Sequence, residues 1–180
     1  MPFEHELWFK TNGKEGHQLN LTGSDFSGKD LEDSIMIKVN FDGANLSDVN
    51  LAYSNLNYSS FKGTNLRNSF IIKAEADHAN FEGANLSNCN LLRTSFIETS
   101  FREADLTNAD LSLTLLKDVD FSNAILDKCN FSDVSLFGAK GLEAVKLEWI
   151  NIGENEKGKP NILWGAEAIK WLLTEAEKPI

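Results

Sequence analysis

The sequence predicts a solenoid, a chain wound into stacked coils, and two regularities carry this prediction. Every fifth residue from Leu21 to Leu136 is apolar, in 24 positions out of 24. A period of five fits neither an α-helix, with about 3.6 residues per turn, nor a β-strand, with a period of about two. Within this series, phenylalanine recurs every 20 residues from Phe41 to Phe121. The chain must therefore turn a corner once per repeat and complete one coil in four repeats.

The repeats also share a polar position, because the residue before each apolar centre is Asn or Asp in 15 of the 24 repeats. Stretches such as GANLS at 43–47 and 83–87, and EADLT at 103–107, show the pattern clearly. On these residues the chain resembles the pentapeptide-repeat family, whose consensus is A(D/N)Lxx, over about two thirds of its length. This resemblance implies an all-β fold, a right-handed quadrilateral β-helix of about six coils.

Glycine marks one corner of the predicted coil, at positions 23, 43, 63 and 83, which are 20 residues apart. Asn123 takes the same place further along the chain, and asparagine also tolerates a positive φ. We therefore expect a type II turn at this corner, because that turn needs a residue with positive φ.

The two ends of the chain differ from the repeats, since all four Trp and all three Pro lie outside residues 19–141. Such atypical ends are typical of solenoids, whose terminal coils need capping. We expect an N-terminal cap at 1–18, the β-helix at 19–141 and a C-terminal cap at 142–180. The C-terminal cap should contain a short α-helix near 165–176, where apolar residues follow helical spacing, after a linker at 154–161.

The first coil of the solenoid should need a cover, because its backbone has no preceding coil to pair with. Phe3, Leu7, Trp8 and Phe9 are the apolar residues expected to supply that cover. Lys29 occupies a position that is small and points inward in most repeats, which indicates that the first coil is not fully closed.

The charge of the chain excludes one class of partner. With 17 basic and 27 acidic residues the net charge is −10. Direct nucleic-acid binding is therefore not expected, because a phosphate-binding face needs clustered Lys and Arg. The N-terminus lacks a signal-peptide pattern and no apolar stretch is long enough to span a membrane. A soluble cytoplasmic protein without membrane contact is the expectation.

No motif for catalysis, nucleotide binding or metal binding occurs in the sequence. Cys89 and Cys129 lie two coils apart, about 10 Å by strand spacing, which is too far for a disulfide, so both are expected to be small core residues. His78 lies near Glu75 and Asp77, but outward positions on a coil face water, so a solvated histidine is expected. We predict no enzyme activity, no catalytic residues, no cofactor and no bound metal.

Apolar residues at outward positions gather on the third and fourth sides of the predicted coil, counted from the side that contains Phe41. The candidate interaction surface, called the apolar surface below, consists of Tyr53, Tyr58, Phe70, Ile72, Leu92, Ile97 and Leu113. One-sided apolar exposure of this kind is typical of a contact site. Three occupants fit it: a terminal segment of the same chain, a second copy of the chain, or a different protein.

Two functions are compatible with these features. The first is a protein-binding scaffold without catalytic activity, which uses the apolar surface. The second is implied by the resemblance: some pentapeptide-repeat proteins mimic duplex DNA, bind type II topoisomerases such as DNA gyrase, and act in fluoroquinolone resistance or toxin immunity. Mimicry should show as an acidic stripe on the rod, whereas the acidic residues here are spread over all four sides.

Overall fold

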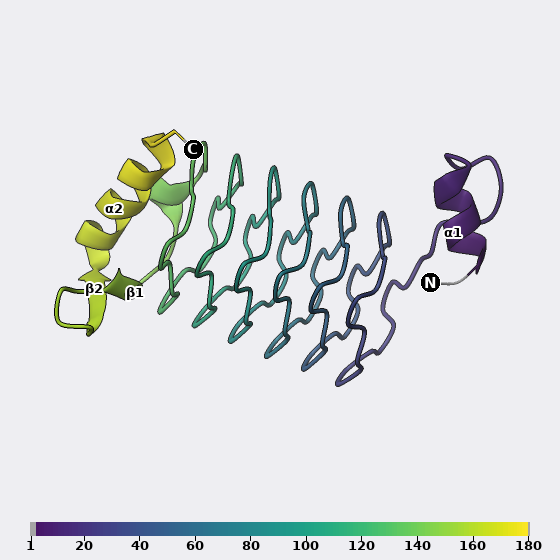
Figure 1. The fold of residues 1–180 in the computed structure, drawn as a ribbon, viewed down its shortest axis with the longest axis horizontal. Coiled ribbons are helices and arrows are strands. Elements are labelled where there is room, and N and C mark those ends of the chain that lie inside the picture. The colour runs from purple at the N-terminus through teal and green to yellow at the C-terminus, as the bar shows by residue number, and fades with distance from the viewer. Residues whose placement is uncertain (1–2, 180) are drawn as a thin grey trace.

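A computed structural model describes residues 3–179 and shows a repeat solenoid with a helix at each end (Figure 1). Parallel backbone bridges recur at every fifth residue, and each joins a residue to its equivalent in the next coil, from Asn20↔Asn40 to Asp120↔Lys140. Four bridged positions per coil give the solenoid four sides, and the stretch 20–139 makes six regular coils. The predicted arrangement of four repeats per coil is confirmed.

The four sides are numbered here by the bridged residue of the second coil: Asn40, Asn45, Asn50 and Asn55 lie on the first to fourth sides. Each corner takes the number of the side that it follows. Successive coils are joined by backbone hydrogen bonds, for example from Asn45 N to Ser24 O at 2.9 Å. The stack is therefore held together by the hydrogen bonds of a parallel sheet, interrupted at every corner.

Apolar side chains fill the tube. From Phe41 to Leu136, every central residue of the repeats is at most 1% exposed. The five phenylalanines of the first side form one stacked column, with ring centroids 4.6 to 5.4 Å apart and planes within 14°. Phe96, on the fourth side, packs edge-on against Phe81 and Phe101. The predicted inward direction of the central residues and the phenylalanine column are confirmed.

Residues with positive φ form the corners. Glycine supplies this conformation at the first corner, as predicted, with φ of 64° at Gly43 and 60° at Gly63. Residues with side chains also adopt it, at the first corner in the last two coils, where Glu103 has φ of 57° and Asn123 has φ of 60°, and at the other corners, for example Tyr58 at 62°. A Cβ added at Gly63 would meet nothing within 4 Å, so backbone conformation, and not space, favours glycine there.

The coil continues beyond the sixth turn with one extra residue. The short 3₁₀ helix η1 (Leu142–Ala144) lengthens the period by one, so that Lys146 bridges to Ile125 and Asn151 bridges to Asn130. The last full coil is therefore paired along three of its four sides, the third pairing being Asp120 with Lys140 on the first side.

A hairpin and a helix cover the C-terminal end of the stack (Figure 1). Strand β1 (Trp149–Glu154) pairs antiparallel with β2 (Pro160–Trp164). The turn between them lies within the expected linker 154–161, but both ends of that segment are strand residues. Helix α2 (Gly165–Glu177) follows β2 directly and is the predicted C-terminal helix. The Trp171 ring of α2 lies 6.5 Å from that of Phe131 in the sixth coil, so the helix packs onto the core.

Helix α1 (Phe3–Lys10) stands at the opposite end and is fastened to the fourth corner. His5 Nε2 lies 2.9 Å from Ile37 O, and its Nδ1 accepts a hydrogen bond from Leu19 N. Residues 1–2 and the Phe3 side chain of the expected N-terminal cover lie outside the described residues. Of the other expected cover residues, Leu7 and Trp8 are half-buried, and Phe9 is 38% exposed. The central residues of the first coil remain partly exposed, so the expected cover is incomplete, because α1 contacts the coil at its fourth corner.

Candidate functional site

The seven predicted residues of the apolar surface all lie on the third and fourth sides or at the corners that follow them. Four of them are exposed by 43 to 54% of their area: Leu113, Phe70, Tyr53 and Tyr58. The other three are half-buried: Ile72, Leu92 and Ile97. The surface therefore runs along the rod over four coils, from the second to the fifth.

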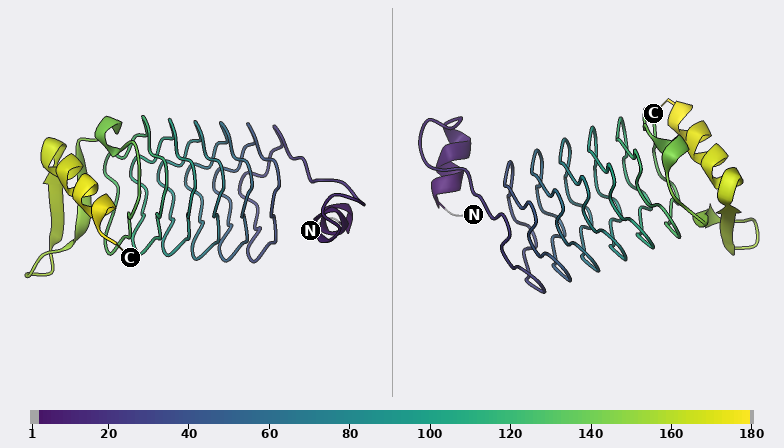
Figure 2. Two further views of the ribbon diagram at one scale, coloured as in Figure 1. Left: turned by 90° about the horizontal axis from the view of Figure 1, so that it is seen from above. Right: turned by 180° about the vertical axis from the view of Figure 1, so that it is seen from behind.

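The terminal segments lie elsewhere. Helix α2 and the hairpin sit on the C-terminal end of the solenoid, and α1 stands at the N-terminal end (Figure 2). Tyr53, Tyr58 and Phe70 keep about half of their area in contact with solvent while every described segment is in place. Within residues 3–179, no terminal segment therefore covers these three side chains.

Four side chains contact one another in a stack along the fourth corner. The rings of Tyr58 and His78 are parallel within 8°, with centroids 4.6 Å apart. The Lys38 ammonium lies 5.8 Å from the centre of the Tyr58 ring, and His78 Nδ1 lies 3.4 Å from a carboxylate oxygen of Glu98. These four residues occupy equivalent positions in four successive coils, so the stack is a direct result of coil register. His78 is solvent-exposed, as predicted.

The third corner carries positive charge in an otherwise acidic chain. Lys73 Nζ lies 5.3 Å from the centre of the Tyr53 ring and 3.5 Å from its hydroxyl oxygen. Arg93 takes the same corner position one coil later, followed by Leu113. From the second to the fifth coil this corner carries two cations and no carboxylate, against a net charge of −10 for the chain. Sequence reasoning missed these cation–ring contacts, although the equivalent positions of the residues in successive coils were their signal.

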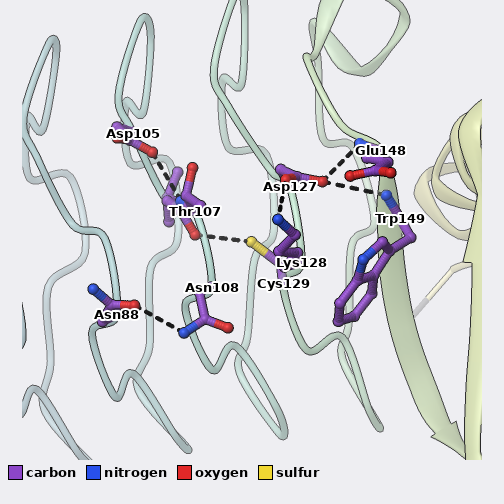
Figure 3. Close-up of polar contacts among 10 residues, drawn as sticks. Asn88, Asp105, Thr107, Asn108, Asp127, Lys128, Cys129, Glu148 and Trp149 are labelled. Atoms are coloured by element: carbon purple, nitrogen blue, oxygen red, sulfur yellow. Dashed lines mark hydrogen bonds and ion pairs between the residues drawn. The ribbon is translucent and has the colours of Figure 1, made fainter.

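The Asn and Asp columns have a structural role, which the hydrogen bonds show directly (Figure 3). Asp105 Oδ1 accepts a hydrogen bond from the backbone of Thr107 at 2.9 Å, two residues along the chain. At the second corner, Asn108 donates to Asn88 Oδ1 in the coil before, at 2.8 Å. These side chains hold turns and coil register, because they satisfy polar groups that the corners leave unpaired.

Asp127 joins the last coil to the C-terminal segment (Figure 3). Its Oδ1 accepts hydrogen bonds from the backbone N–H groups of Glu148 at 2.7 Å and Trp149 at 3.3 Å, and Oδ2 lies 3.4 Å from Lys128 Nζ. Partial burial opposes ionisation of this carboxyl, but the two N–H groups and the Lys128 ammonium together hold its pKa below the usual value.

The two thiols are core residues. Cys89 and Cys129 are free and at most 1% exposed, as predicted, and their sulfur atoms donate to backbone carbonyl groups of the preceding coil. Burial raises the pKa of the Cys89 thiol to about 11 and raises that of Cys129 further. Within residues 3–179, no group of three His, Cys, Asp or Glu side chains is arranged to hold a metal ion. In the same range, neither helix has the length and apolar character needed to cross a membrane.

Comparison with known proteins gives a family match over most of the solenoid. A family model described as "Pentapeptide repeats" matches residues 18–51, 44–83, 77–112 and 114–140, with 8 copies. A search of curated proteins gave no match.

Solved structures with a similar fold include QnrB1, a plasmid-mediated fluoroquinolone resistance protein. The identity is 21%, the TM-score is 0.63, and the match covers 71% of this chain and 70% of QnrB1. HetL, involved in heterocyst differentiation regulation in the cyanobacterium Nostoc, matches at 22% identity and a TM-score of 0.36, over 81% of this chain and 73% of HetL. A protein of the Arabidopsis thaliana thylakoid lumen matches at 18% identity and a TM-score of 0.49, over 82% and 89%. At 21% identity, the QnrB1 match shows a shared fold.

Proposed function

Because this chain belongs to the pentapeptide-repeat family, we propose that it is a non-enzymatic protein-binding scaffold whose contact site is the apolar surface. The proposal includes the right-handed winding that the family resemblance implies, the division into 1–18, 19–141 and 142–180, and a cytoplasmic location. The observation that carries it is that the exposed large apolar side chains of the coils, which are Ile35, Tyr53, Tyr58, Phe70 and Leu113, all lie on the third and fourth sides or at their corners.

The chemistry of the surface suits a protein partner. Tyrosine contributes a large, rigid contact area together with a hydroxyl group, and it is enriched at binding hot spots. Tyr53 and Tyr58 each have a lysine ammonium over one ring face, which aligns cationic donors beside apolar area. The filled tube offers little concavity for a small substrate, which supports binding over catalysis.

Affinity capture from the source cell, with variants as controls, tests this proposal. The surface variant combines Tyr58→Ser with Phe70→Ser, and the matched control combines Arg67→Ser at the second corner with Glu103→Ser at the first corner, both exposed. We expect wild type and control to retain a defined protein that the surface variant loses by about tenfold or more. Equal capture by the surface variant, or no specific capture by wild type, would reject the scaffold.

A second copy is the other occupant of the same surface. Leu92→Glu places a charge in the middle of the apolar surface on a half-buried position. If a dimer forms through this surface, Leu92→Glu converts it to a monomer that keeps its fold, whereas a heterologous partner would be lost with no change in mass.

The alternative function is modulation of a type II topoisomerase by DNA mimicry, of the quinolone-resistance or toxin-immunity type. Its support is the net charge of −10 and the likeness of fold to QnrB1. A DNA gyrase supercoiling assay, with and without a fluoroquinolone, decides it. Inhibition of supercoiling or protection from the drug would favour the alternative, and the absence of both effects would remove it.

A further inference from the structure

The N-terminal end of the solenoid is open. Four central residues of the first coil are only partly buried: Leu21, Phe26, Leu31 and Met36. The central residues of every later coil are fully buried. Lys29 is exposed at an inward position where Val49, one coil later, is completely buried. A lysine at this position is compatible with the fold only because the tube ends there, as the sequence indicated.

The backbone of the first coil forms a free sheet edge on three sides. In the second coil, Asn45 N donates to Ser24 O and Asn50 N donates to Lys29 O. The equivalent N–H groups of the first coil belong to Asp25, Asp30 and Ile35, and they have no hydrogen bond within residues 3–179. Helix α1 and the segment after it satisfy acceptors only at the fourth corner, through His5 and Gln18.

Three acidic side chains of the first coil do not block pairing at this edge. Carboxylates on an edge strand normally prevent pairing with another chain. Here Asp25 Oδ1 accepts from Asn45 at 3.1 Å, and Asn50 donates to both Asp30 and Glu32 at 3.0 Å. All three carboxylates are therefore turned toward the second coil and away from the open end.

We propose that the open end binds the open end of a second copy of this chain. An edge of short strands arranged in a square, with apolar side chains in the middle, is complementary to another coil end of the same cross-section. The C-terminal end of the chain is covered by the hairpin and α2, so it does not offer such a partner (Figure 1). Only like ends can meet, which gives a closed two-fold dimer and not a filament.

Charge complementarity selects one orientation of the pair. In this orientation a two-fold axis perpendicular to the rod passes through the third side at Asp30–Leu31. The axis places the second corner of each copy opposite the third corner of the other. Lys29 beside the second corner of each copy then faces Asp33, an exposed residue at the third corner of the other. The same axis sets α1, at the fourth corner, over the first corner of the second copy, where Gly23 has open space around it.

Molar mass measured by light scattering or sedimentation, on the full chain from about 10 μM to 1 mM, tests the proposal. We expect wild type to approach twice 20.0 kDa as concentration rises, and added salt to weaken the dimer. Lys29→Glu should weaken dimerisation by about tenfold, and so should Asp33→Lys. Lysine suits position 33, because Lys73 has φ of 53° at the same corner.

Mixing the two charge variants should restore a dimer, because each supplies the charge that the other lacks. Lys62→Glu, which makes the same charge change in the third coil, and Leu92→Glu, on the apolar surface, should leave dimerisation unchanged. A chain that stays monomeric up to the highest concentration, a dimer that survives both charge variants, or a dimer lost in Leu92→Glu would each overturn the proposal. This dimer is independent of the scaffold function, which is tested by capture through a different surface.

Discussion

The ring of Phe81 lies face to face with that of Phe61 in the coil before, with centroids 4.6 Å apart and planes 1° apart. This separation is close to the strand spacing of about 4.8 Å, so the side chains keep the register of the backbone. Within one repeat, the central residue is consequently buried and the corner residue exposed, in coil after coil. The same substitution can therefore be made at a buried and at an exposed position and the two effects compared.

Leu111 and Leu113 provide the closest matched pair. Leu111 is completely buried in the tube, whereas Leu113 is 43% exposed at the third corner. Leu111→Ala should lower the free energy of unfolding by about 2–5 kcal/mol, because it leaves a cavity. Leu113→Ala should change it by less than about 0.5 kcal/mol. Urea unfolding of both variants checks this, and similar losses in the two would contradict the inward and outward assignment.

Gly63 tests the conformation of the first corner. Its φ of 60° disfavours a residue with a Cβ, so Gly63→Ala should lower the free energy of unfolding by about 1 kcal/mol. Gly63→Asn should cost less, because Asn123 adopts φ of 60° at the same corner. Thermal unfolding of the two variants gives the comparison. Equal stability of Gly63→Ala and wild type would show that this corner does not depend on glycine.

The thiols should react only after unfolding. Burial excludes reagents and raises the pKa of Cys89 to about 11, so little thiolate forms near neutral pH. Labelling with a small alkylating reagent at about pH 8 should modify neither Cys89 nor Cys129 in the folded protein, and both in urea. Rapid modification of either thiol in native buffer would place that residue at the surface.

Asp127 should make docking of the C-terminal segment sensitive to acid. Its pKa is lower in the folded state than in the unfolded chain, where it is about 3.9. Its contribution to stability is therefore fully present above the unfolded value, and it is lost as pH falls through the folded value. Asp127→Asn should lower stability by about 1 kcal/mol at neutral pH, and the difference from wild type should shrink below about pH 4.

Urea unfolding at several pH values measures this difference, with Asp105→Asn as a control that bonds only within its own turn. A difference between wild type and Asp127→Asn that stays constant from neutral pH to strong acid would contradict the assigned cause.

The solenoid could be predicted because one short pattern repeats many times. Each repeat from Leu21 to Leu136 supports the same period, and residues 20 apart in the sequence are neighbours in successive coils. The hairpin β1–β2 has no such redundancy: the contact of Trp149 with Trp164, at 6.2 Å between ring centroids, occurs once. Helix α1 likewise bonds to the first coil through His5, which lies outside the repeats, so neither element followed from the periodicity.

The apolar surface could be predicted only in part. The positions of Tyr58 and Phe70 follow from the register, and the stack of Tyr58 on His78 was implied by their equivalent places in successive coils. Whether a terminal segment covers these side chains depends on where the ends of the chain pack, which the repeat pattern does not determine. The structure places both ends beyond the coils concerned (Figure 2).

Hydroxyl-radical labelling of the purified protein, read residue by residue by mass spectrometry, tests most directly whether the apolar surface is free to bind. Tyr53, Tyr58 and Phe70 should be oxidised in the folded protein at about half of their rates in urea, because about half of their area is exposed, while Phe61 and Phe81 should be protected. Protection of Tyr53, Tyr58 and Phe70 as strong as that of Phe61, in the monomeric protein, would show that the surface is covered and would contradict its proposed role.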